Sequence, residues 1–431
     1  LLSPIQVPDP YNQAERSTIF AVLEGEELLI KKHQEEWSKL WESDILIEGD
    51  DEAQLDIRSM LYHLYATMRP KTDFSPSPMG LSGLGYNGHV FWDSEIFMFP
   101  PLLFLQPALA ESMLSYRFNR LDAAKQIATI NGYRGAMYPW ESATSGHEET
   151  PVWALTGPFE HHITADVAIA AWNYYVVTQD KEWLKSKGWP ILENTANFWA
   201  SRVVLNEVGE YVINNVVAAD EWAENVNNNA YTNGAAKRNL EYAELAAKVI
   251  GVDYPKEWGV IARKIPIRQL DNGVTSEYDG YAGQNIKQAD VNLLAYPLEL
   301  VTNKEQIEKD LIYYAERVPE RDTPAMTQAI FALLYSRMGN TDRAYHWFED
   351  AYKPNKLPPF GVLAETKGGD NPFFLTGAGG ILQTVLMGFG GLAVKPNGEV
   401  YQKNSVMPKH WKRLTIKGVG KDRKTFVRVN K

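Results

Sequence analysis

Apolar residues recur at helical spacing along most of this chain, and this periodicity limits the possible folds more than any other feature. In one segment the apolar positions follow one another at steps of three or four residues, which places them on one helix face: Ala236, Leu240, Ala243, Ala247 and Ile250. The same spacing recurs at Ile163, Val167, Ala170, Tyr174 and Val177, and at Met326, Ile330, Leu333 and Arg337. The pattern predicts a mainly α fold with about a dozen helices of ordinary length.

Two of these helices follow each other with a short connection. Asp322-Thr323-Pro324 predicts a helix start with Pro at the first helical position, Gly339 predicts its end, and a second helix follows over Thr341–Tyr352. The pair resembles a unit of a helical-repeat scaffold of the tetratricopeptide kind, but no recurrence at a fixed period follows. Helix pairs joined by alternating short and long connections instead favour a closed ring of hairpins.

The long connections are rich in aromatic and carboxylate residues. They cover residues 71–88, 134–158, 215–233, 273–284 and 355–371. Structureless connections of this length in a folded domain are usually functional, and a ring of hairpins gathers them at one end.

One stretch, 373–394, carries no charge and therefore has to be tested as a membrane span. Six glycines and Gln383 interrupt it, and no cationic residue flanks its near end. We interpret it as a buried core helix followed by a glycine-rich turn, with a transmembrane helix as the alternative.

The two ends of the chain differ from its middle. A charged helix is expected over 15–42, and residues 392–431 hold eleven Lys and Arg against two Asp and Glu. Alternating segments at 413–417 and 425–429 predict strands. We therefore expect a linker helix region at 1–50, a helical barrel at 51–391 and a small β segment at 392–431.

Composition excludes several classes of partner and chemistry. A formal net charge of −11 disfavours nucleic acid, whose phosphates require a basic face. The chain has no cysteine, so disulfides and thiol nucleophiles are excluded. Its 13 Trp and 22 Tyr either build a large core or bind sugar rings, and composition alone leaves both open.

Two carboxylate-bearing segments are candidates for acid–base chemistry. Glu221 lies in the segment 220–233, which also contains Asp220, Glu224, Trp222 and a run of amides that suit sugar hydroxyls. An amide-rich capping loop is the alternative. Glu365 follows an apolar run at the start of a glycine-rich loop, where a solvated edge is the alternative. Cleavage of a glycosidic bond with inversion needs two carboxyl groups ~6.5–9.5 Å apart, one to protonate the leaving oxygen and one to activate water.

Two further segments join tryptophan to a carboxylate at a loop–helix border. They are Trp92-Asp93 and Trp140-Glu141, in which the ring can stack on a sugar and the carboxylate can accept two hydroxyl hydrogens. Neighbouring histidines suggest a metal as the alternative. However, none of the His, Asp and Glu spacings forms a known ligand pattern, and we expect no metal.

Five strings occur in order along the chain, and together they resemble glycoside hydrolase family 65. They are GHVFWDSEIFMFPPLL, MYPWESATSGHEETP, DEWAENVNNNAYTN, IKQAD and FLTGAGGILQTVL. The resemblance covers the chain from about residue 34 to its end. It implies an (α/α)6 barrel of helical hairpins with a small C-terminal β appendage, preceded in the family by a β-sandwich domain that is not seen in this sequence.

The resemblance also implies roles for residues. The family's general acid falls on Glu221, with Glu224 as the rival, and Trp222 is expected beside it. The glucose-binding positions fall on Trp92, Asp93, Trp140, Glu141, Lys287 and Gln288.

Glu365 decides between the two reactions of this family. Phosphorylases of the family use inorganic phosphate as nucleophile, and a carboxylate at that position repels phosphate and suits water. Hydrolases of the family resemble this sequence in placing a Glu shortly before the FLTGAGG run, so Glu365 is the expected general base. Lys367 is a nearby cation that would favour phosphate instead.

The sequence therefore predicts an inverting α-glucoside hydrolase that needs no cofactor. The resemblance favours α-1,2-linked glucose as in kojibiose, and next an α-1,2-glucosyl-galactose unit. A phosphorylase of the family and a non-catalytic glycan-binding module are the alternatives. The expected partners are the small-molecule substrate, the upstream β-sandwich domain and a possible second copy in a homodimer.

Overall fold

Helices make up most of the structure, a computed structural model that describes residue 4 and residues 7–430. The chain divides into two units, Leu1–Asp44 and Ile45–Lys431. The described part of the first unit contains α1 (Pro10–Glu24) and α2 (Glu26–Leu40), and neither helix buries a residue. One charged helix was predicted over 15–42, but Gly25 has φ 83°, which an α-helix cannot accommodate, and the chain breaks there into two.

The second unit is built around a closed inner layer. Among the described residues, six helical segments each pack against the next, and the last returns to the first. In chain order they are η2 (Ser94–Met98) continued by α4 (Phe99–Leu105), α8 (His162–Thr178), α11 (Ala230–Ile250), η4 (Val291–Leu294), α14 (Ala325–Met338), and α16 (Leu375–Gln383) continued by η6 (Thr384–Phe389).

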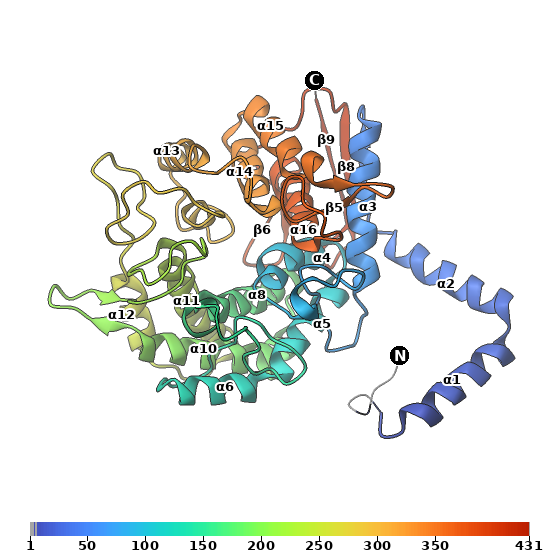
Figure 1. The fold of residues 1–431 in the computed structure, drawn as a ribbon, viewed down its shortest axis with the longest axis horizontal. Helices are drawn as coiled ribbons and strands as arrows, with labels where there is room; N and C mark the ends of the chain where they lie inside the picture. Colours follow the sequence, from blue (N-terminus) through green and yellow to red (C-terminus); the bar gives the residue numbers. More distant parts are fainter. Residues whose placement is uncertain (1–3, 5–6, 431) are drawn as a thin grey trace. The chain divides into compact units, whose positions relative to one another are not determined.

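An outer layer of helices covers this ring (Figure 1). Each outer helix packs on one or two inner segments. The outer helices are α3 (Asp51–Thr67), α5 (Pro107–Asn119), α10 (Trp189–Arg202), α12 (Glu257–Lys264), α13 (Lys304–Ala315) and α15 (Thr341–Tyr352). Six inner segments inside six outer helices form an (α/α)6 barrel, which confirms the predicted fold class.

The apolar pattern explains which helices lie inside. Nearly every residue of α8 and of α14 is buried, whereas α13 and α15 bury one face. The cap of α14 differs slightly from the prediction. Pro324 is the residue before the helix rather than its first residue, and Gly339 at φ 87° ends the helix as expected.

The uncharged stretch 373–394 lies in the barrel core. All residues of α16 and η6 are buried, which confirms the predicted core helix. Its glycines permit close packing, because a Cβ at Gly379 would lie 2.5 Å from the Phe97 carbonyl oxygen. Among the described residues, no helix combines the length and apolarity that crossing a bilayer requires.

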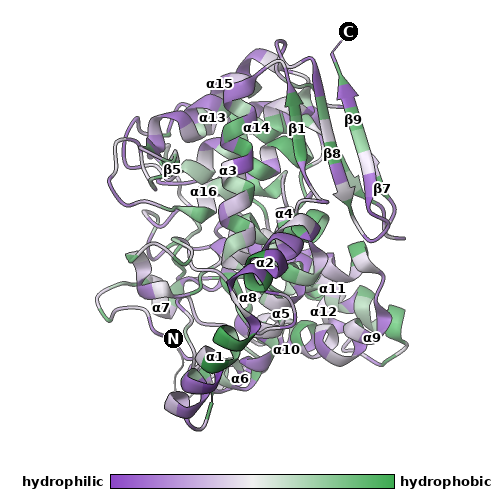
Figure 2. Cartoon of the chain, turned by 90° about the vertical axis from the view of Figure 1, so that its right-hand side faces the viewer, coloured by the Kyte–Doolittle hydropathy of each residue, from purple (hydrophilic) through white to green (hydrophobic). Residues whose placement is uncertain are grey.

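Small sheets lie beside the helices. The largest has the order β1-β8-β9, in which β1 (Ile45–Glu48) pairs antiparallel with β8 (Arg413–Val419) and β8 pairs with β9 (Lys424–Val429), as Figure 2 shows. The two predicted strands at 413–417 and 425–429 are thus confirmed. β1 comes from residues expected to be linker, so the sheet joins both ends of the Ile45–Lys431 unit.

The remaining elements are short. The two-stranded sheets pair β2 (Val204–Leu205) with β3 (Tyr211–Val212), β4 (Lys356–Leu357) with β5 (Val362–Leu363), and β6 (Leu392–Val394) with β7 (Val400–Gln402). The short helices are η1 (Gly85–Gly88), α6 (Leu121–Ile130), α7 (Thr156–Phe159), α9 (Lys181–Trp183), η3 (Leu184–Gly188) and η5 (Lys353–Asn355).

Candidate active site

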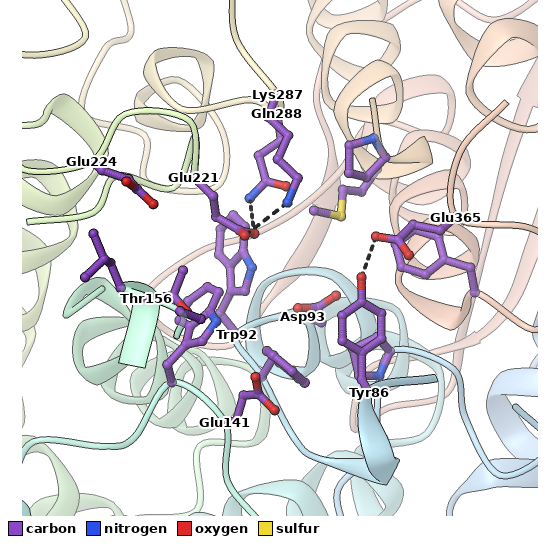
Figure 3. Close-up of a pocket in the computed structure, with 18 of the residues that line it drawn as sticks. Tyr86, Trp92, Asp93, Glu141, Thr156, Glu221, Glu224, Lys287, Gln288 and Glu365 are labelled. Carbon is purple, nitrogen blue, oxygen red and sulfur yellow. Dashed lines mark hydrogen bonds and ion pairs between the residues drawn. The ribbon is translucent and has the colours of Figure 1, made fainter. Parts of the chain in front are cut away.

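The segments that lead into the inner helices meet around a cavity of about 310 Å³ (Figure 3). Its wall consists of Pro78, Tyr86, Phe91, Trp92, Asp93, Trp140, Glu141, Trp153, Ala154, Leu155, Thr156, Glu221, Glu224, Lys287, Gln288, Pro324, Met326, Glu365 and Phe374. Each of the six inner segments is preceded or begun by some of these residues. The cavity therefore lies at the N-terminal end of the inner layer, and four of the five predicted long connections contribute to its wall; 273–284 does not.

The segment before η2 places an aromatic ring and a carboxylate in the wall. Tyr86, Asn87 and Gly88 all have positive φ, and His89 N–H donates to the Tyr86 carbonyl at 2.8 Å, so the chain reverses sharply there. Trp92 and Asp93 come after this reversal and directly precede η2. Both are almost fully buried, and their position is fixed by the packed inner helix behind them.

Glu221 projects from a tight turn. The Ala223 N–H donates to the Asp220 carbonyl oxygen at 2.8 Å, and the Trp222 N–H approaches the Asp220 carboxylate at 3.3 Å. Because consecutive side chains of a turn diverge, Glu221 enters the cavity whereas Trp222 does not. Trp222, expected beside the acid as a substrate-binding residue, is half exposed and is not among the residues of the cavity wall.

Two residues of the segment before η4 contact Glu221 (Figure 3). The Lys287 ammonium donates to Glu221 Oε2 at 3.0 Å, and the Gln288 amide reaches Glu221 Oε1 at 3.5 Å. Burial alone would lower the pKa of Lys287, but the carboxylates around it, Glu221 first, raise the pKa above its usual value. Lys287 therefore stays cationic.

Glu365 reaches the cavity from a different loop, and Figure 3 shows it across the cavity from Glu221. The Tyr86 hydroxyl donates to Glu365 Oε1 at 2.6 Å, and the Asn371 amide donates to Oε2 at 3.1 Å. Its main chain is also held, because the Ala325 N–H donates to the Glu365 carbonyl at 3.0 Å. Two side-chain donors thus fix the orientation of the carboxylate, one on each oxygen.

Two more carboxyl groups line the cavity between these walls. Burial raises the pKa of Asp93 to about 7, although Thr376 opposes this shift by donating to Asp93 Oδ2 at 2.5 Å. Burial also raises the pKa of Glu141, and His89, whose Nδ1 lies 2.8 Å from Glu141 Oε2, opposes the shift. Both groups can exchange hydrogen bonds with hydroxyls.

Aromatic rings form the floor. The Trp92 and Trp140 ring centroids lie 6.4 Å apart, and the His162 ring meets both edge-on. His162 lies between two carboxyl groups, with Nδ1 2.7 Å from Asp166 and Nε2 3.0 Å from Glu160. Burial would lower the pKa of His162, but these two acids raise it to about 10, so a buried cation supports the floor.

The structure brings eight of the nine predicted site residues together in the cavity wall. These are Trp92, Asp93, Trp140, Glu141, Glu221, Lys287, Gln288 and Glu365. Trp92 and Trp140 are 2% and 4% exposed, so the rings shape the floor with a small part of their surface instead of offering an open stacking face. Glu224 also lines the cavity and stays a rival to Glu221.

Sequence reasoning missed several residues that line the cavity or contact its carboxyl groups. Tyr86 lies two residues before the string that begins at Gly88. Its left-handed backbone conformation cannot be predicted from the amino-acid sequence. Trp153 was within a connection expected to be functional, and its exposed side chain lines the cavity. Asn371 and Thr376 act on acids six and 283 positions away, and such pairing is visible only in three dimensions.

Histidines near the cavity hold carboxyl groups. His89 contacts Glu141, and His162 contacts Glu160 and Asp166. Within the described residues no group of three or more His, Asp and Glu side chains is arranged to hold a metal ion.

Several known proteins are similar to this chain in sequence. Residues 58–285 match the glycosyl hydrolase family 65 central catalytic domain. The chain is 66% identical over 427 residues to a kojibiose hydrolase of Flavobacterium johnsoniae, covering 99% of this chain and 63% of the relative. It is 60% identical over 419 residues to a kojibiose hydrolase of Mucilaginibacter mallensis, covering 97% and 62%.

A solved structure described as a kojibiose phosphorylase from the human microbiome has the same fold. It aligns with a TM-score of 0.81 at 21% identity, covering all of this chain and 64% of that one. The chain spans less than two thirds of the length of the curated relatives it matches. The matched domain and the five strings assign the chain to a family: it belongs to glycosyl hydrolase family 65.

Proposed function

We propose that this chain carries the active site of an inverting α-glucosidase that hydrolyses α-1,2-linked glucosides such as kojibiose. Glu221 is the general acid and Glu365 is the general base. The kojibiose hydrolases to which the chain is 66% and 60% identical support the substrate, since hydrolysis of kojibiose is what their names state.

The charge of the cavity wall is the observation that carries hydrolysis rather than phosphorolysis. The described wall has five carboxyl groups and one cation. That cation, Lys287, already contacts Glu221. Lys367, the cation that could have favoured phosphate, does not line the cavity, because its ammonium lies 2.6 and 2.7 Å from the two oxygens of Asp350. A phosphate dianion would therefore meet mostly negative charge, whereas water meets no such barrier.

Glu365 has the surroundings that a general base requires. Tyr86 and Asn371 each occupy one carboxylate oxygen with a single hydrogen bond, and each oxygen keeps a second lone pair for a water proton. A base held by two donors is oriented before substrate arrives.

The sugar at the reacting end lies over the Trp92 and Trp140 floor. Asp93 and Glu141 exchange hydrogen bonds with its hydroxyls from one side, and Lys287 and Gln288 donate from the side of Glu221. When a sugar hydroxyl takes over the hydrogen bond from Lys287, Glu221 loses its ion pair, takes up a proton from solvent and presents its carboxyl group to the bridging oxygen.

In the proposed reaction one bond breaks, one bond forms and two protons move. Glu221 gives its proton to the bridging oxygen, the bond from that oxygen to the anomeric carbon breaks, and positive charge develops on the glucose ring. A water oxygen attacks the anomeric carbon from the opposite face, and its proton passes to Glu365. The products are β-glucose and the free leaving sugar.

A proton NMR time course on kojibiose in phosphate-free buffer tests the proposal. We expect β-glucose to appear first and to mutarotate later, with no gain in rate on adding phosphate. The assay uses the intact protein as it is naturally produced. Release of glucose 1-phosphate that requires phosphate would establish the phosphorylase alternative, and α-glucose as first product would exclude inversion.

Three Glu→Gln variants test the roles. Glu221→Gln and Glu365→Gln should each lower kcat on the order of 10²–10⁴-fold, the usual contribution of a general acid or base. Glu224→Gln should retain far more activity. If Glu224→Gln is the inactive variant and Glu221→Gln is active, the acid has been assigned to the wrong residue.

A further inference from the structure

A buried carboxyl group that the proposed reaction does not use lies behind the acid turn. Glu277 is fully buried, and neither of its carboxyl oxygens receives a hydrogen bond from a donor in the described part of the chain. Its main chain is fixed, since the Ala230 N–H and the Asn229 amide donate to the Glu277 carbonyl at 2.7 and 3.1 Å. The backbone at Glu277 is thus anchored, whereas its buried carboxyl group has no N–H or hydroxyl donor among the described residues.

The Glu277 carboxyl group lies within hydrogen-bonding reach of the buried Asp220 carboxyl group, and the charge of buried Asp290 also acts on it. Asp220 accepts from the Lys287 N–H at 2.7 Å, and Asp290 accepts from the Asn229 amide at 2.9 Å and from a main-chain N–H at 3.1 Å. Three buried carboxylates whose charges act on one another are not all ionised, because each charge raises the pKa of the others. The two that accept N–H donors are suited to carry negative charge, and Glu277 is suited to carry the proton.

The other ionisable groups near Glu277 do not offer it a proton. They are Tyr278, Tyr281 and Tyr314, whose pKa values it helps to raise. The hydroxyls of Tyr281 and Tyr314 donate to the carbonyls of Gln284 and Thr275 at 2.6 and 2.7 Å. Burial, followed by the charges of Asp290 and Asp220, raises the pKa of Glu277 well above its usual value.

Asp220 connects this group to the active site. It precedes Glu221, its carbonyl closes the turn that carries Glu221, and its carboxylate holds the main chain of Lys287. Lys287 in turn contacts Glu221 (Figure 3). A shift of Asp220 would therefore move the general acid and its cation together.

We propose that Glu277 is a positioning residue, whose protonated carboxyl donates a hydrogen bond to Asp220 and thereby holds the turn that carries Glu221. The inference rests on the proposed role of Glu221 as general acid. It assigns a fixed proton to a group that does not touch the substrate.

Two variants at one position test the hydrogen bond on full-length protein. Glu277→Gln keeps an N–H donor in the same place, so kcat on kojibiose should stay within about threefold of wild type. Glu277→Leu removes the donor, and displacement of the acid should lower kcat on the order of 10- to 100-fold with a smaller change in KM. Equal kcat for Glu277→Leu and wild type would overturn the proposal, as would equal losses for both variants.

α-Glucosyl fluoride separates acid positioning from general damage to the site. Its C1–F bond breaks with the electron pair leaving on fluoride, which needs little protonation, while water still bonds to C1 and gives its proton to Glu365. The kcat of Glu277→Leu should therefore fall less than about threefold on the fluoride and much more on kojibiose. This difference is expected whenever a general acid is impaired. Equal losses on both substrates would show damage to the whole site and contradict a positioning role.

Asp310→Asn is the matched control. Asp310 accepts from the Thr275 N–H and hydroxyl at 2.8 Å each, so this variant loosens the same segment two residues before Glu277 without touching the contact with Asp220. We expect a lower Tm and unchanged kcat. A kcat loss in Asp310→Asn equal to that of Glu277→Leu would attribute the effect to the segment and refute the proposal.

Thermal unfolding tests the proton itself and does not depend on the proposed activity. A carboxyl group whose pKa is raised on folding stabilises the protein fully at low pH, and the contribution is lost as pH rises toward the folded pKa. Glutamine cannot lose a proton, so the Tm of Glu277→Gln relative to wild type should increase with pH. A constant or decreasing difference would show that Glu277 is ionised and would overturn the inference, even if kojibiose proved not to be the substrate.

Discussion

Asp93→Asn should make the protein more stable at alkaline pH while leaving its stability at acidic pH nearly unchanged. Burial raises the pKa of Asp93 to about 7 from 3.8, and the charges of Glu365 and Glu221 add to this shift. The folded protein thus binds a proton that the unfolded chain releases. The stabilisation that this proton gives is complete below the unfolded pKa and is lost as pH rises through the folded one.

The size of the effect follows from the shift. A difference of about three units corresponds to about 4 kcal/mol of unfolding free energy at 1.36 kcal/mol per unit, which is the upper limit for the change between acidic and alkaline pH. Asparagine has the shape of the protonated acid, and its amide oxygen can still accept from the Thr376 hydroxyl that contacts Asp93. The unfolding free energy of the variant should therefore not fall as Asp93 titrates, and the substitution leaves no packing void.

The assay compares Tm for wild type and Asp93→Asn at about pH 5 and about pH 8. Most of the expected loss of wild-type stability falls between these two values. The difference in Tm, variant minus wild type, should increase by several degrees between the two conditions. Other buried acids titrate in both proteins and cancel. Asp122→Asn, at an exposed surface position, is the control and should show no such change.

One result would refute this reasoning. If the Tm difference is the same at both values of pH, or if Asp93→Asn loses stability at the alkaline one, Asp93 is already ionised in the folded protein. Its burial beside Glu221 and Glu365 would then not control its proton.

Three further substitutions follow from single contacts. Tyr86→Phe removes a charge-assisted hydrogen bond to Glu365, worth about 1.5–3 kcal/mol, and should lower kcat roughly 10-fold while the circular dichroism spectrum stays unchanged. Gly379→Ala places a Cβ 2.5 Å from the Phe97 carbonyl oxygen and should lower the unfolding free energy by about 1–3 kcal/mol in a denaturant titration. Lys367→Met breaks an ion pair outside the cavity wall and should cost less than about 1 kcal/mol, with kcat on kojibiose unchanged and no new response to phosphate.

The helices and strands could be predicted because their determinants are local, whereas the (α/α)6 barrel was implied by the resemblance to the family. Helical periodicity, the Gly339 stop and the alternating segments at 413–417 and 425–429 each depend on residues close together in sequence. The break at Gly25 was missed because one glycine within a charged pattern does not reveal a positive φ.

The candidate site was predictable where carboxylates and tryptophans stand in one string, as at Trp92-Asp93 and Trp140-Glu141. It was not predictable where one group acts on another from a distant segment, as the Tyr86 hydroxyl does on Glu365. Adjacency in sequence does not place a residue in the wall, since Trp222 follows Glu221 but is not among the residues that line the cavity.

The position of the cavity in the barrel explains how so many acids can share it. It lies at the N-terminal end of the inner layer, and a helix carries about half a positive charge at its N-terminus. The helices α8, α11, α14 and α16 begin next to wall residues, so their fields oppose the repulsion among the carboxylates. The same field would attract a phosphate if the acids were absent. In the proposed reaction, the Glu365 carboxylate would occupy positive potential that an anionic nucleophile would otherwise use, which favours water as the nucleophile.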